Sequence, residues 1–206
     1  LHNHIPRIIS NQKNKKFVSL FSTPIAGKTI VVVGTGNLGS AMIRLLVPLS
    51  PKIIGINRKG GTVDGCSKVI TVDKIDSILP EADILYLATP ETPETKNLIN
   101  RKRLDLLKPS CGIVNIGRQS TMDYDALCEK LKTNKIAGAI LDVFAPEPIE
   151  PNSKLWKVPN LIITPHVSAD DGESYVGLTL DLFIKNLQLF ISNKKLVNQI
   201  DKDFGY

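Results

Sequence analysis

A glycine-rich turn between a strand and a helix is the feature that most restricts the fold of this chain. The turn Gly34-Thr35-Gly36-Asn37-Leu38-Gly39 directly follows the β-branched run Thr29-Ile30-Val31-Val32-Val33. An uninterrupted apolar run of this kind is typical of a strand that is buried on both faces in a parallel sheet. Residues 38–47 have a helical pattern that stops before Pro48, because proline cannot continue a helix.

The three glycines of this turn have separate physical roles. The first allows a tight turn, the second lets the backbone approach a pyrophosphate, and the third lets the helix pack against the strand. The helix N-terminus offers free N–H groups and the positive end of its dipole to phosphates. A purely structural glycine turn is the alternative, but the flanking strand and helix favour a dinucleotide site. We therefore expect cofactor contacts from Gly34, Gly36, Asn37, Leu38 and Gly39.

The rest of the chain alternates short apolar strands with short helices. This alternation predicts an α/β fold with a right-handed, doubly wound parallel sheet, the Rossmann fold. Residues 174–192 carry apolar side chains at helical spacing and predict one long amphipathic helix. Ligands of such sheets bind beyond the carboxyl ends of the strands. Strands are expected at 52–56, 68–71, 84–88, 112–116, 137–141 and 161–164, and helices at 74–79, 101–107 and 124–132.

Composition narrows the class of partner. The net charge of +6 would suit nucleic acid, but the basic residues are mostly dispersed, and aromatic residues make up only 5% of the chain, too few for base-stacking platforms. A solvated basic face is the preferred interpretation. No apolar run approaches the roughly 20 residues of a membrane span, and the three cysteines have no metal-ligand spacing. We expect a cytoplasmic protein with reduced thiols and with no metal, nucleic-acid or membrane partner.

The end of the second predicted strand bears on the choice of coenzyme. About 20 residues after the glycine turn, an NAD-binding fold usually has an acidic residue that holds the ribose 2′-hydroxyl. Here Asn57 takes that place, and Arg58 and Lys59 follow it. A carboxylate would repel a 2′-phosphate, whereas a neutral amide beside two cations would attract one. We expect NADP in preference to NAD; the alternative is that Arg58 and Lys59 are solvated loop charges.

Three later segments place polar side chains at the carboxyl ends of predicted strands. Residues 114–120 contain Arg118, residues 141–148 contain Glu147, and residues 163–168 contain His166. Each alone has a structural explanation, such as a surface turn for Glu147. Beside a dinucleotide turn they predict a reaction centre, because reduction of a 2-keto acid needs a cation for the carboxylate, a proton donor for the carbonyl oxygen and a hydride source.

Five motifs extend this pattern along the chain from about Pro24 to the C-terminus. In order and composition they resemble those of the D-isomer-specific 2-hydroxyacid dehydrogenases, which include glyoxylate/hydroxypyruvate reductases and phosphoglycerate dehydrogenases. Residues 164–171 are most similar to the glyoxylate-reductase-like branch. The motifs are the glycine turn, Ala88-Thr89-Pro90-Glu91-Thr92-Pro93-Glu94-Thr95, Asn115-Ile116-Gly117-Arg118, Asp142-Val143-Phe144-Ala145-Pro146-Glu147-Pro148 and Thr164-Pro165-His166.

The resemblance implies a role for each matching residue. Arg118 would bind the substrate carboxylate and help to polarise the carbonyl group. His166 would be the general acid in reduction and the base in oxidation, and Glu147 would hydrogen-bond His166 and stabilise its imidazolium form. Asp142 would hold the nicotinamide carboxamide. The remaining cofactor side would be formed by Thr89, Pro90, Thr95, Ile116 and Gly117.

The chain departs from the family pattern in two places. Gln119 stands where the family usually has glycine, which adds a side chain beside the expected substrate pocket. A whole family member also begins with a substrate-binding domain, most of which is absent here, so we expect a fragment that binds cofactor better than it turns over substrate. We expect an interdomain remnant and linker at 1–22, the dinucleotide-binding domain at 23–170 and a returning segment at 171–206. The family further implies a homodimer.

Two functions other than that of an oxidoreductase fit parts of this pattern. A nucleotide-sensing, co-repressor-like protein on the same scaffold stays open, because sensors can retain Arg118, Glu147 and His166. A fold relative with another reaction, such as adenosylhomocysteine hydrolysis, leaves the Asp142–Pro148 and Thr164–His166 segments unexplained. The sequence therefore favours hydride transfer between NAD(P)H and a small 2-keto or 2-hydroxy acid.

Overall fold

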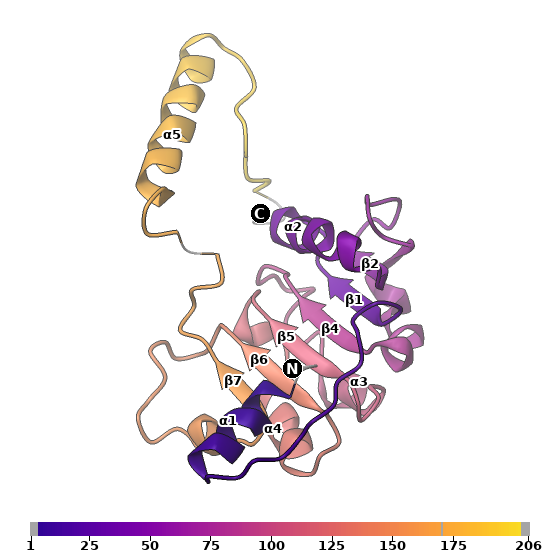
Figure 1. Cartoon of the computed structure of the whole chain (residues 1–206). Helices are drawn as coiled ribbons and strands as arrows, with labels where there is room; N and C mark the ends of the chain where they lie inside the picture. Colours follow the sequence, from indigo (N-terminus) through magenta and orange to yellow (C-terminus); the bar gives the residue numbers. More distant parts are fainter. Residues whose placement is uncertain (1–3, 170, 203–206) are drawn as a thin grey trace. The chain divides into compact units, whose positions relative to one another are not determined.

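The computed structural model describes residues 4–169 and 171–202. The chain divides into two compact units, Leu1–Pro165 and His166–Tyr206. The first unit contains every strand of the sheet, together with helix α1 (Ile5–Lys13) and the shorter helices, and the second contains the long helix α5 (Tyr175–Ile191) (Figure 1).

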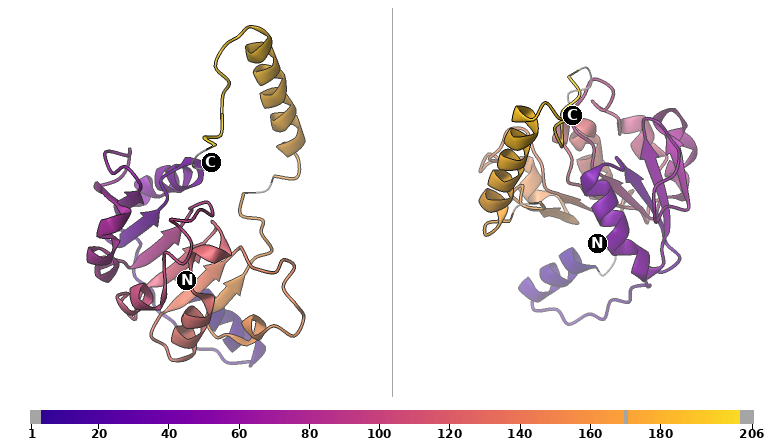
Figure 2. Two further views of the ribbon diagram at one scale, coloured as in Figure 1. Left: turned by 180° about the vertical axis from the view of Figure 1, so that it is seen from behind. Right: turned by 90° about the horizontal axis from the view of Figure 1, so that it is seen from above.

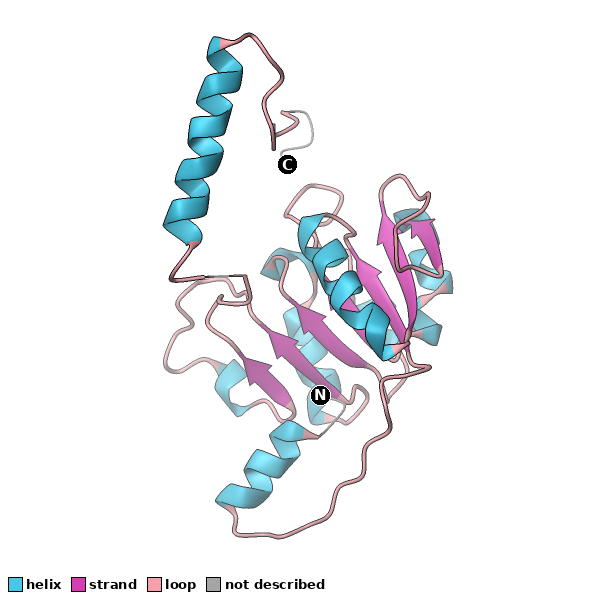
Figure 3. Cartoon of the chain, turned by 45° about the horizontal axis from the view of Figure 1, so that its top comes forward, coloured by secondary structure: helices cyan, strands magenta, loops and turns pink. Residues whose placement is uncertain are grey.

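The sheet has seven strands in the order β3-β2-β1-β4-β5-β6-β7, and every neighbouring pair is parallel (Figure 3). This confirms the predicted doubly wound parallel sheet. The chain leaves β1 toward one edge, through β2 and β3, and returns to the other side of β1 through β4. The point where the direction reverses therefore lies between β1 and β4. The strands are β1 (Thr29–Val33), β2 (Lys52–Asn57), β3 (Lys68–Thr71), β4 (Ile84–Leu87), β5 (Gly112–Asn115), β6 (Gly138–Leu141) and β7 (Leu161–Ile163).

Both faces of the sheet are covered, as the apolar run of β1 predicts. Successive side chains of a strand point to opposite faces, so Ile30 and Val32 pack into one cluster with Ile43 of helix α2 (Asn37–Leu46). Val31 and Val33 belong to the cluster on the other face, under helices α3 (Arg101–Asp105) and α4 (Tyr124–Lys132). Figure 2 shows these helices on the two sides of the sheet.

Element bounds differ from the expected ones mainly in the short helices. The helix expected at 74–79 is wrong in type, because the segment forms two 3₁₀ turns, η2 (Val72–Ser77) and η3 (Leu79–Glu81). The α-helical nucleus is costly for so short a segment, and Pro80 lacks the N–H that would continue a helix. Helix α2 begins one residue earlier than expected, at Asn37, and α3 ends two residues earlier, at Asp105. Further 3₁₀ turns are η1 (Val47–Leu49), η4 (Gln119–Thr121) and η5 (Lys154–Lys157).

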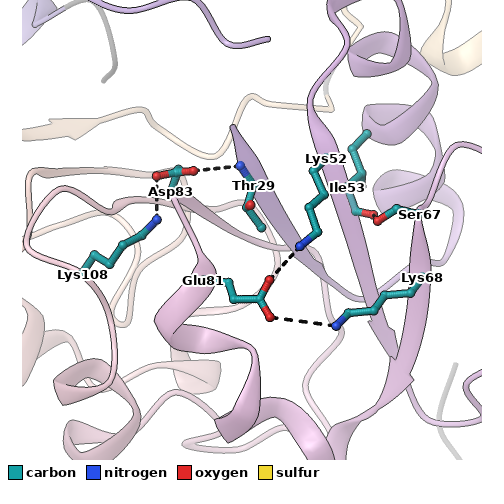
Figure 4. A network of polar contacts seen from close by, with 8 residues as sticks. All are labelled: Thr29, Lys52, Ile53, Ser67, Lys68, Glu81, Asp83 and Lys108. Carbon is teal, nitrogen blue, oxygen red and sulfur yellow. Dashed lines mark hydrogen bonds and ion pairs between the residues drawn. The ribbon is translucent and has the colours of Figure 1, made fainter. Parts of the chain in front are cut away.

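Ion pairs tie together the amino ends of the strands, at the edge opposite the glycine turn (Figure 4). Asp83 accepts hydrogen bonds from the Thr29 amide at 2.8 Å and from Lys108 Nζ at 2.7 Å. Glu81 pairs with Lys52 at 2.8 Å and with Lys68 at 4.0 Å. These contacts join the starts of β1, β2, β3 and β4, and so hold the strand ends in register.

The second unit consists mainly of α5, which has the bounds that the helical spacing predicted to within one residue at each end. None of the residues of α5 is buried. The Asn186 side chain bonds the backbone of Val197 through both its oxygen (2.9 Å) and its nitrogen (3.1 Å), which folds the following segment back along the helix. Across residues 4–169 and 171–202, no helix is both long and apolar enough to cross a membrane.

Candidate active site

The glycine turn has the close contacts that its spacing predicts. A Cβ atom on Gly34 would lie 2.7 Å from the Ala88 carbonyl oxygen, and Gly34 also has a φ of +92°. On Gly39, a Cβ atom would lie 1.9 Å from the Gly34 oxygen. A Cβ atom on Gly36, in contrast, would meet nothing within 4 Å. The first and third glycines are therefore required by packing, and the second leaves open space beside the backbone.

The N-terminus of α2 is suited to hold phosphate. Its N-cap is Gly36, which makes no side-chain capping bond, so no side chain of its own N-cap competes for the first N–H groups. The Ser40 hydroxyl donates to the Thr35 carbonyl oxygen at 2.8 Å and so fixes the shape of the turn. Asn37 and Leu38 are exposed at the start of the helix.

The loop after β4 lies directly beside this turn, at the point where the strand order reverses. Thr89 is only 8% exposed, and its Oγ1 is buried without a hydrogen-bond partner among the described residues. A Cβ atom on Gly117 would lie 2.5 Å from the Thr89 carbonyl oxygen, so the loops after β4 and β5 touch. A buried hydroxyl that lacks a partner in the described part of the chain, in a residue that lies against Gly34 of the glycine turn, fits a bound dinucleotide.

The predicted cofactor residues that follow Thr89 are used within their own loop. The Thr95 hydroxyl donates to the Pro90 carbonyl oxygen at 2.7 Å and accepts a hydrogen bond from the Thr92 amide at 2.8 Å. These bonds close residues 90–95 into a turn. Thr95 thus shapes the loop that borders the site, while Pro90 is exposed on it.

Asn57, at the end of β2, organises the loop in which the coenzyme-selecting charges lie. Its Oδ1 accepts from the amides of Lys59 (3.0 Å) and Gly60 (2.6 Å), and its Nδ2 donates to Thr35 Oγ1 at 2.9 Å. Asn57 therefore connects this loop to the glycine turn. Sequence reasoning did not identify Thr35 as its partner, because the two residues meet only once β1 and β2 are paired.

Arg58 lies on the same exposed loop, and its positive charge affects the segment after β4. The pKa of Glu94 is lowered, mainly by a hydrogen bond with Thr92 and to a smaller extent by the positive charge of Arg58. Arg58 is thus close enough to residues 90–95 for its charge to be felt there. Lys59 is exposed as well.

Arg118 follows β5 in a loop that is held by Asn115. The Asn115 side chain accepts from the Gly117 amide at 3.0 Å and donates to the Arg118 carbonyl oxygen at 3.2 Å. Thr121 Oγ1 donates to the same carbonyl oxygen at 2.7 Å. The Arg118 side chain is exposed, and its Nη1 donates to the Gly117 carbonyl oxygen at 2.8 Å. The cationic group is therefore accessible, while its backbone is fixed. Ile116 precedes Gly117 and packs beneath the loop.

The loop after β6 carries two of the predicted carboxylates. Asp142 is 1% exposed and accepts a hydrogen bond from Thr164 Oγ1 at 2.5 Å, just after β7. Glu147 is exposed, and its Oε1 accepts from the Phe144 amide at 2.6 Å. Because all strands are parallel, these residues lie at the same edge of the sheet as Arg118 and the glycine turn.

His166 is the first residue of the second unit. Its backbone has a φ of 56°, in the left-handed region that residues other than glycine seldom adopt. The first unit thus places Arg118, Asp142, Glu147 and the predicted cofactor residues at the carboxyl ends of its strands. His166 directly follows Thr164 and Pro165, which end that unit.

A cavity of about 390 Å³ lies beside the loops that carry Arg118 and Glu147. Gln119, Tyr124, Phe144 and Pro146 are among the residues that line it. The side chain that replaces the usual glycine after the arginine therefore faces a hollow in the first unit. Asn115, Ser120 and Thr164 lie in segments that the sequence identifies, but no role is predicted for them, and Tyr124 carries no sequence signal of its own.

Comparison with known proteins gives consistent matches. The family model for the NAD binding domain of D-isomer specific 2-hydroxyacid dehydrogenases matches residues 1–168. A glyoxylate reductase from Thermococcus litoralis is 34% identical over 87% of this chain and 54% of that relative. The NADPH-dependent glyoxylate/hydroxypyruvate reductase from Sinorhizobium meliloti, in complex with NADP and sulfate, matches 100% of this chain and 65% of its own, with a TM-score of 0.90 and 27% identity.

A second solved structure agrees. A D-isomer specific 2-hydroxyacid dehydrogenase from Xanthobacter autotrophicus, in complex with NADPH and MES, has a TM-score of 0.91 at 26% identity over 100% of this chain and 84% of that chain. The chain spans 59%, 36% and 54% of the first three curated relatives that it matches, or about half of their length.

Proposed function

Because this chain belongs to the D-isomer specific 2-hydroxyacid dehydrogenases, as their NAD-binding domain, we propose that the whole protein transfers a hydride between NAD(P)H and a small 2-keto or 2-hydroxy acid. The observation that carries this proposal is the shared edge of the sheet, where the glycine turn, Arg118 and Glu147 all follow carboxyl ends of strands. The relatives named glyoxylate reductase support glyoxylate or hydroxypyruvate as the substrate.

Each of the catalytic residues has one task in this reaction. When bound at the glycine turn, a reduced dinucleotide would supply the hydride for the carbonyl carbon. Arg118 binds the substrate carboxylate through its exposed guanidinium group and polarises the carbonyl bond. His166 donates the proton that the carbonyl oxygen takes up, and in the reverse reaction removes it. Glu147 pairs with His166 and stabilises its charged form. Asp142 orients the nicotinamide carboxamide.

The coenzyme that we propose is NADP in preference to NAD. Asn57 carries no charge, and its amide is occupied in shaping the loop. Arg58 is exposed on that loop and its charge reaches residues 90–95, on the cofactor side of the sheet. The Sinorhizobium meliloti relative is NADPH-dependent, which supports the same choice. Further cofactor contacts are proposed for Thr89, Pro90, Thr95, Ile116 and Gly117.

We also propose that the whole protein is a cytoplasmic homodimer with a substrate-binding domain. Residues 1–22 and 171–206 would be the parts that connect to that domain. The apolar side chains of α5 support this, because a helix with this many apolar residues is usually covered by another part of its protein. Substrate would then bind between this chain and the additional domain.

Turnover of keto acids by the whole protein tests the proposal, with His166→Ala as the decisive variant. We expect glyoxylate or hydroxypyruvate to be reduced by the wild type, and His166→Ala to lower kcat by about 10²–10⁴-fold with little change in dinucleotide affinity. His4→Ala is the matched control, since His4 lies in the first unit, away from the predicted centre, and bonds the Phe21 carbonyl oxygen. Near-normal turnover by His166→Ala would remove this histidine from the mechanism. A wild type that binds NADPH but reduces no keto acid would instead favour a nucleotide sensor.

A further inference from the structure

A buried tyrosine links the two loops that carry Arg118 and Glu147. Tyr124, at the start of α4, is 7% exposed. Its hydroxyl accepts a hydrogen bond from Asn115 Nδ2 at 3.1 Å and donates one to the Val143 carbonyl oxygen at 2.8 Å. One phenolic oxygen thus contacts the residue at the end of β5 and a residue just beyond the end of β6.

We propose that Tyr124 is a positioning residue, which holds the Arg118 loop and the Glu147 loop at a fixed separation. This proposal rests on the proposed function of Arg118 and Glu147, and it concerns a residue that the reaction chemistry itself does not require. The pairing of β5 with β6 ends at Asn115 and Leu141, and one further backbone bond runs from the Asp142 amide to the Asn115 carbonyl oxygen at 3.0 Å. Beyond this point, strand pairing does not fix the distance between the two loops.

On one side, Tyr124 acts through Asn115. The Asn115 amide is fully buried, and it holds both the Gly117 amide and the Arg118 carbonyl oxygen. The Tyr124 hydroxyl accepts the second hydrogen of the same Nδ2 group, which fixes the orientation of the amide. A change in that orientation would shift the backbone of Arg118, and with it the guanidinium group that meets the substrate carboxylate.

On the other side, Tyr124 acts through the residues after Asp142. Its hydroxyl holds the Val143 carbonyl oxygen, and its ring packs edge-on against Phe144, with centroids 6.2 Å apart and an interplanar angle of 80°. The Phe144 amide in turn donates to Glu147 Oε1 at 2.6 Å. Tyr124 therefore fixes the backbone from which the Glu147 carboxylate is held.

The hydroxyl keeps its proton at any pH at which the reaction would run. Burial raises the pKa of Tyr124 well above its usual range, and a hydrogen bond with Asn115 opposes this only in part. A neutral hydroxyl can donate to Val143 and accept from Asn115 at once, which is the arrangement that the link needs.

Tyr124→Phe in the whole protein tests the proposal, because it removes the hydroxyl and keeps the ring. We expect kcat/KM for glyoxylate or hydroxypyruvate to fall at least about tenfold, because the hydrogen bonds of the hydroxyl with Asn115 and with Val143 are lost together, and we expect the fall to come mainly from a higher KM for the keto acid. The KM for NADPH should change less than the KM for the keto acid, since the hydrogen bonds of Tyr124 go to Asn115 and Val143 and not to the glycine turn or the Asn57 loop. Any change in the KM for NADPH would come through the neighbouring Gly117 and Asp142. Tyr86→Phe is the matched control: Tyr86 is 5% exposed and packs in the other cluster, with Ile30 and Ile43.

Amide hydrogen exchange of the same variants gives a second readout that does not depend on turnover. Tyr124→Phe should speed exchange in peptides that cover residues 115–121 and 142–148, while Tyr86→Phe should leave both unchanged. Thr121→Val removes the other side-chain donor to the Arg118 carbonyl oxygen, and it should speed exchange only in residues 115–121. If Tyr124→Phe does not accumulate as a folded protein, Asn115→Ser takes its place. Because it also removes the side-chain bonds to Gly117 and Arg118, faster exchange in residues 142–148 is the readout that bears on Tyr124, and unchanged exchange there would contradict the proposal.

The outcomes separate this proposal from the proposed function. A wild type that reduces neither keto acid overturns the function, whatever the exchange shows. An active wild type with unchanged keto-acid KM and unchanged exchange in Tyr124→Phe overturns the positioning role alone. A loss of kcat with both KM values unchanged would show only a smaller folded fraction, and this too would contradict the proposal.

Discussion

Two asparagines form the same kind of side-chain turn at the carboxyl ends of two strands. Asn57 at the end of β2 and Asn115 at the end of β5 each accept a hydrogen bond from the backbone amide two residues later. Such side-chain turns are typical of asparagine, whose short amide reaches its own backbone. In both loops an exposed arginine is held by this turn, Arg58 in one and Arg118 in the other. The asparagines thus shape the backbone, and the arginines are left to meet anionic groups.

The coenzyme preference depends on the first of these loops. We expect the wild type to favour NADPH over NADH by about ten- to a hundredfold in kcat/KM, since one charge-assisted bond to the 2′-phosphate has this effect. Asn57→Asp combined with Arg58→Ala should invert the ratio, because a carboxylate accepts from the ribose hydroxyl and repels the phosphate.

Aspartate at 57 would keep an acceptor for the Lys59 and Gly60 amides, so the turn should survive. Lys59→Ala is the control on the same loop, and it should change the ratio only slightly and in a salt-dependent way. The measurement is kcat/KM for both coenzymes. A wild type that already prefers NADH would show that Arg58 does not meet a phosphate.

At the scale of elements, the glycines in the turn between β1 and α2 have two different roles, one in packing and one in binding the dinucleotide. Gly39→Ala would place a methyl group 1.9 Å from the Gly34 oxygen, whereas Gly36→Ala would meet no protein atom within 4 Å. We therefore expect Gly39→Ala to lower Tm clearly. Gly36→Ala should lower Tm much less, because its methyl group meets no protein atom and the cost is only the roughly 1 kcal/mol by which alanine is a poorer N-cap than glycine. Its Kd for NADPH should nevertheless rise at least about tenfold, because the methyl group fills the space for the pyrophosphate.

Fluorescence titration with NADPH and thermal unfolding measure the two effects separately. Gly172→Ala is a control in the second unit, where an added Cβ also meets nothing within 4 Å. Unchanged NADPH affinity in Gly36→Ala would place the pyrophosphate elsewhere.

Asp83, at the amino ends of the strands, should make the protein less stable in acid. Burial tends to raise the pKa of Asp83, but the hydrogen bonds from Lys108 and from the Thr29 amide outweigh it, so the pKa is lowered. A carboxyl group with a depressed folded pKa stabilises the protein above its unfolded pKa of about 4, and this stabilisation is lost as pH falls through the folded value. Urea unfolding should thus show stability falling below about pH 4, and Asp83→Asn should flatten this dependence.

Asp76→Asn is a suitable comparison, because the Asp76 side chain is 60% exposed where that of Asp83 is 25% exposed. Asp76→Asn should change the pH dependence of the unfolding free energy much less than Asp83→Asn does. If the unfolding free energy of Asp83→Asn depends on pH as that of the wild type does, other carboxylates cause the loss of stability in acid.

At the scale of the whole molecule, the dinucleotide-binding elements all lie in Leu1–Pro165. We therefore expect residues 1–206 alone to bind NADPH in a fluorescence titration. Reduction of glyoxylate by the same preparation should be weak or absent beside the whole protein, because the chain spans only about half of its curated relatives. Robust turnover by residues 1–206 would show that no further domain is needed for the substrate site.

Much of the fold and part of the candidate site follow from short-range patterns in the sequence. The β-branched run of β1, the glycine turn and the alternation of strands and helices predict a doubly wound sheet with its site at the carboxyl ends. These features are predictable because each depends only on residues that are close together in the sequence. The helix expected at 74–79 is 3₁₀ in form, because the spacing of so few residues is compatible with either helical form.

The links that hold the site together were decided only by the tertiary structure. Asn57 meets Thr35 across 22 residues of sequence, Tyr124 meets Val143 across 19, and Thr164 meets Asp142 across 22. The first and third pairs form because parallel pairing brings neighbouring strand ends to one edge, and the second forms because α4 packs under that sheet. No local propensity encodes either arrangement. The sequence by itself therefore determined which residues could act at that edge. The paired sheet determined which side chains hold them in place.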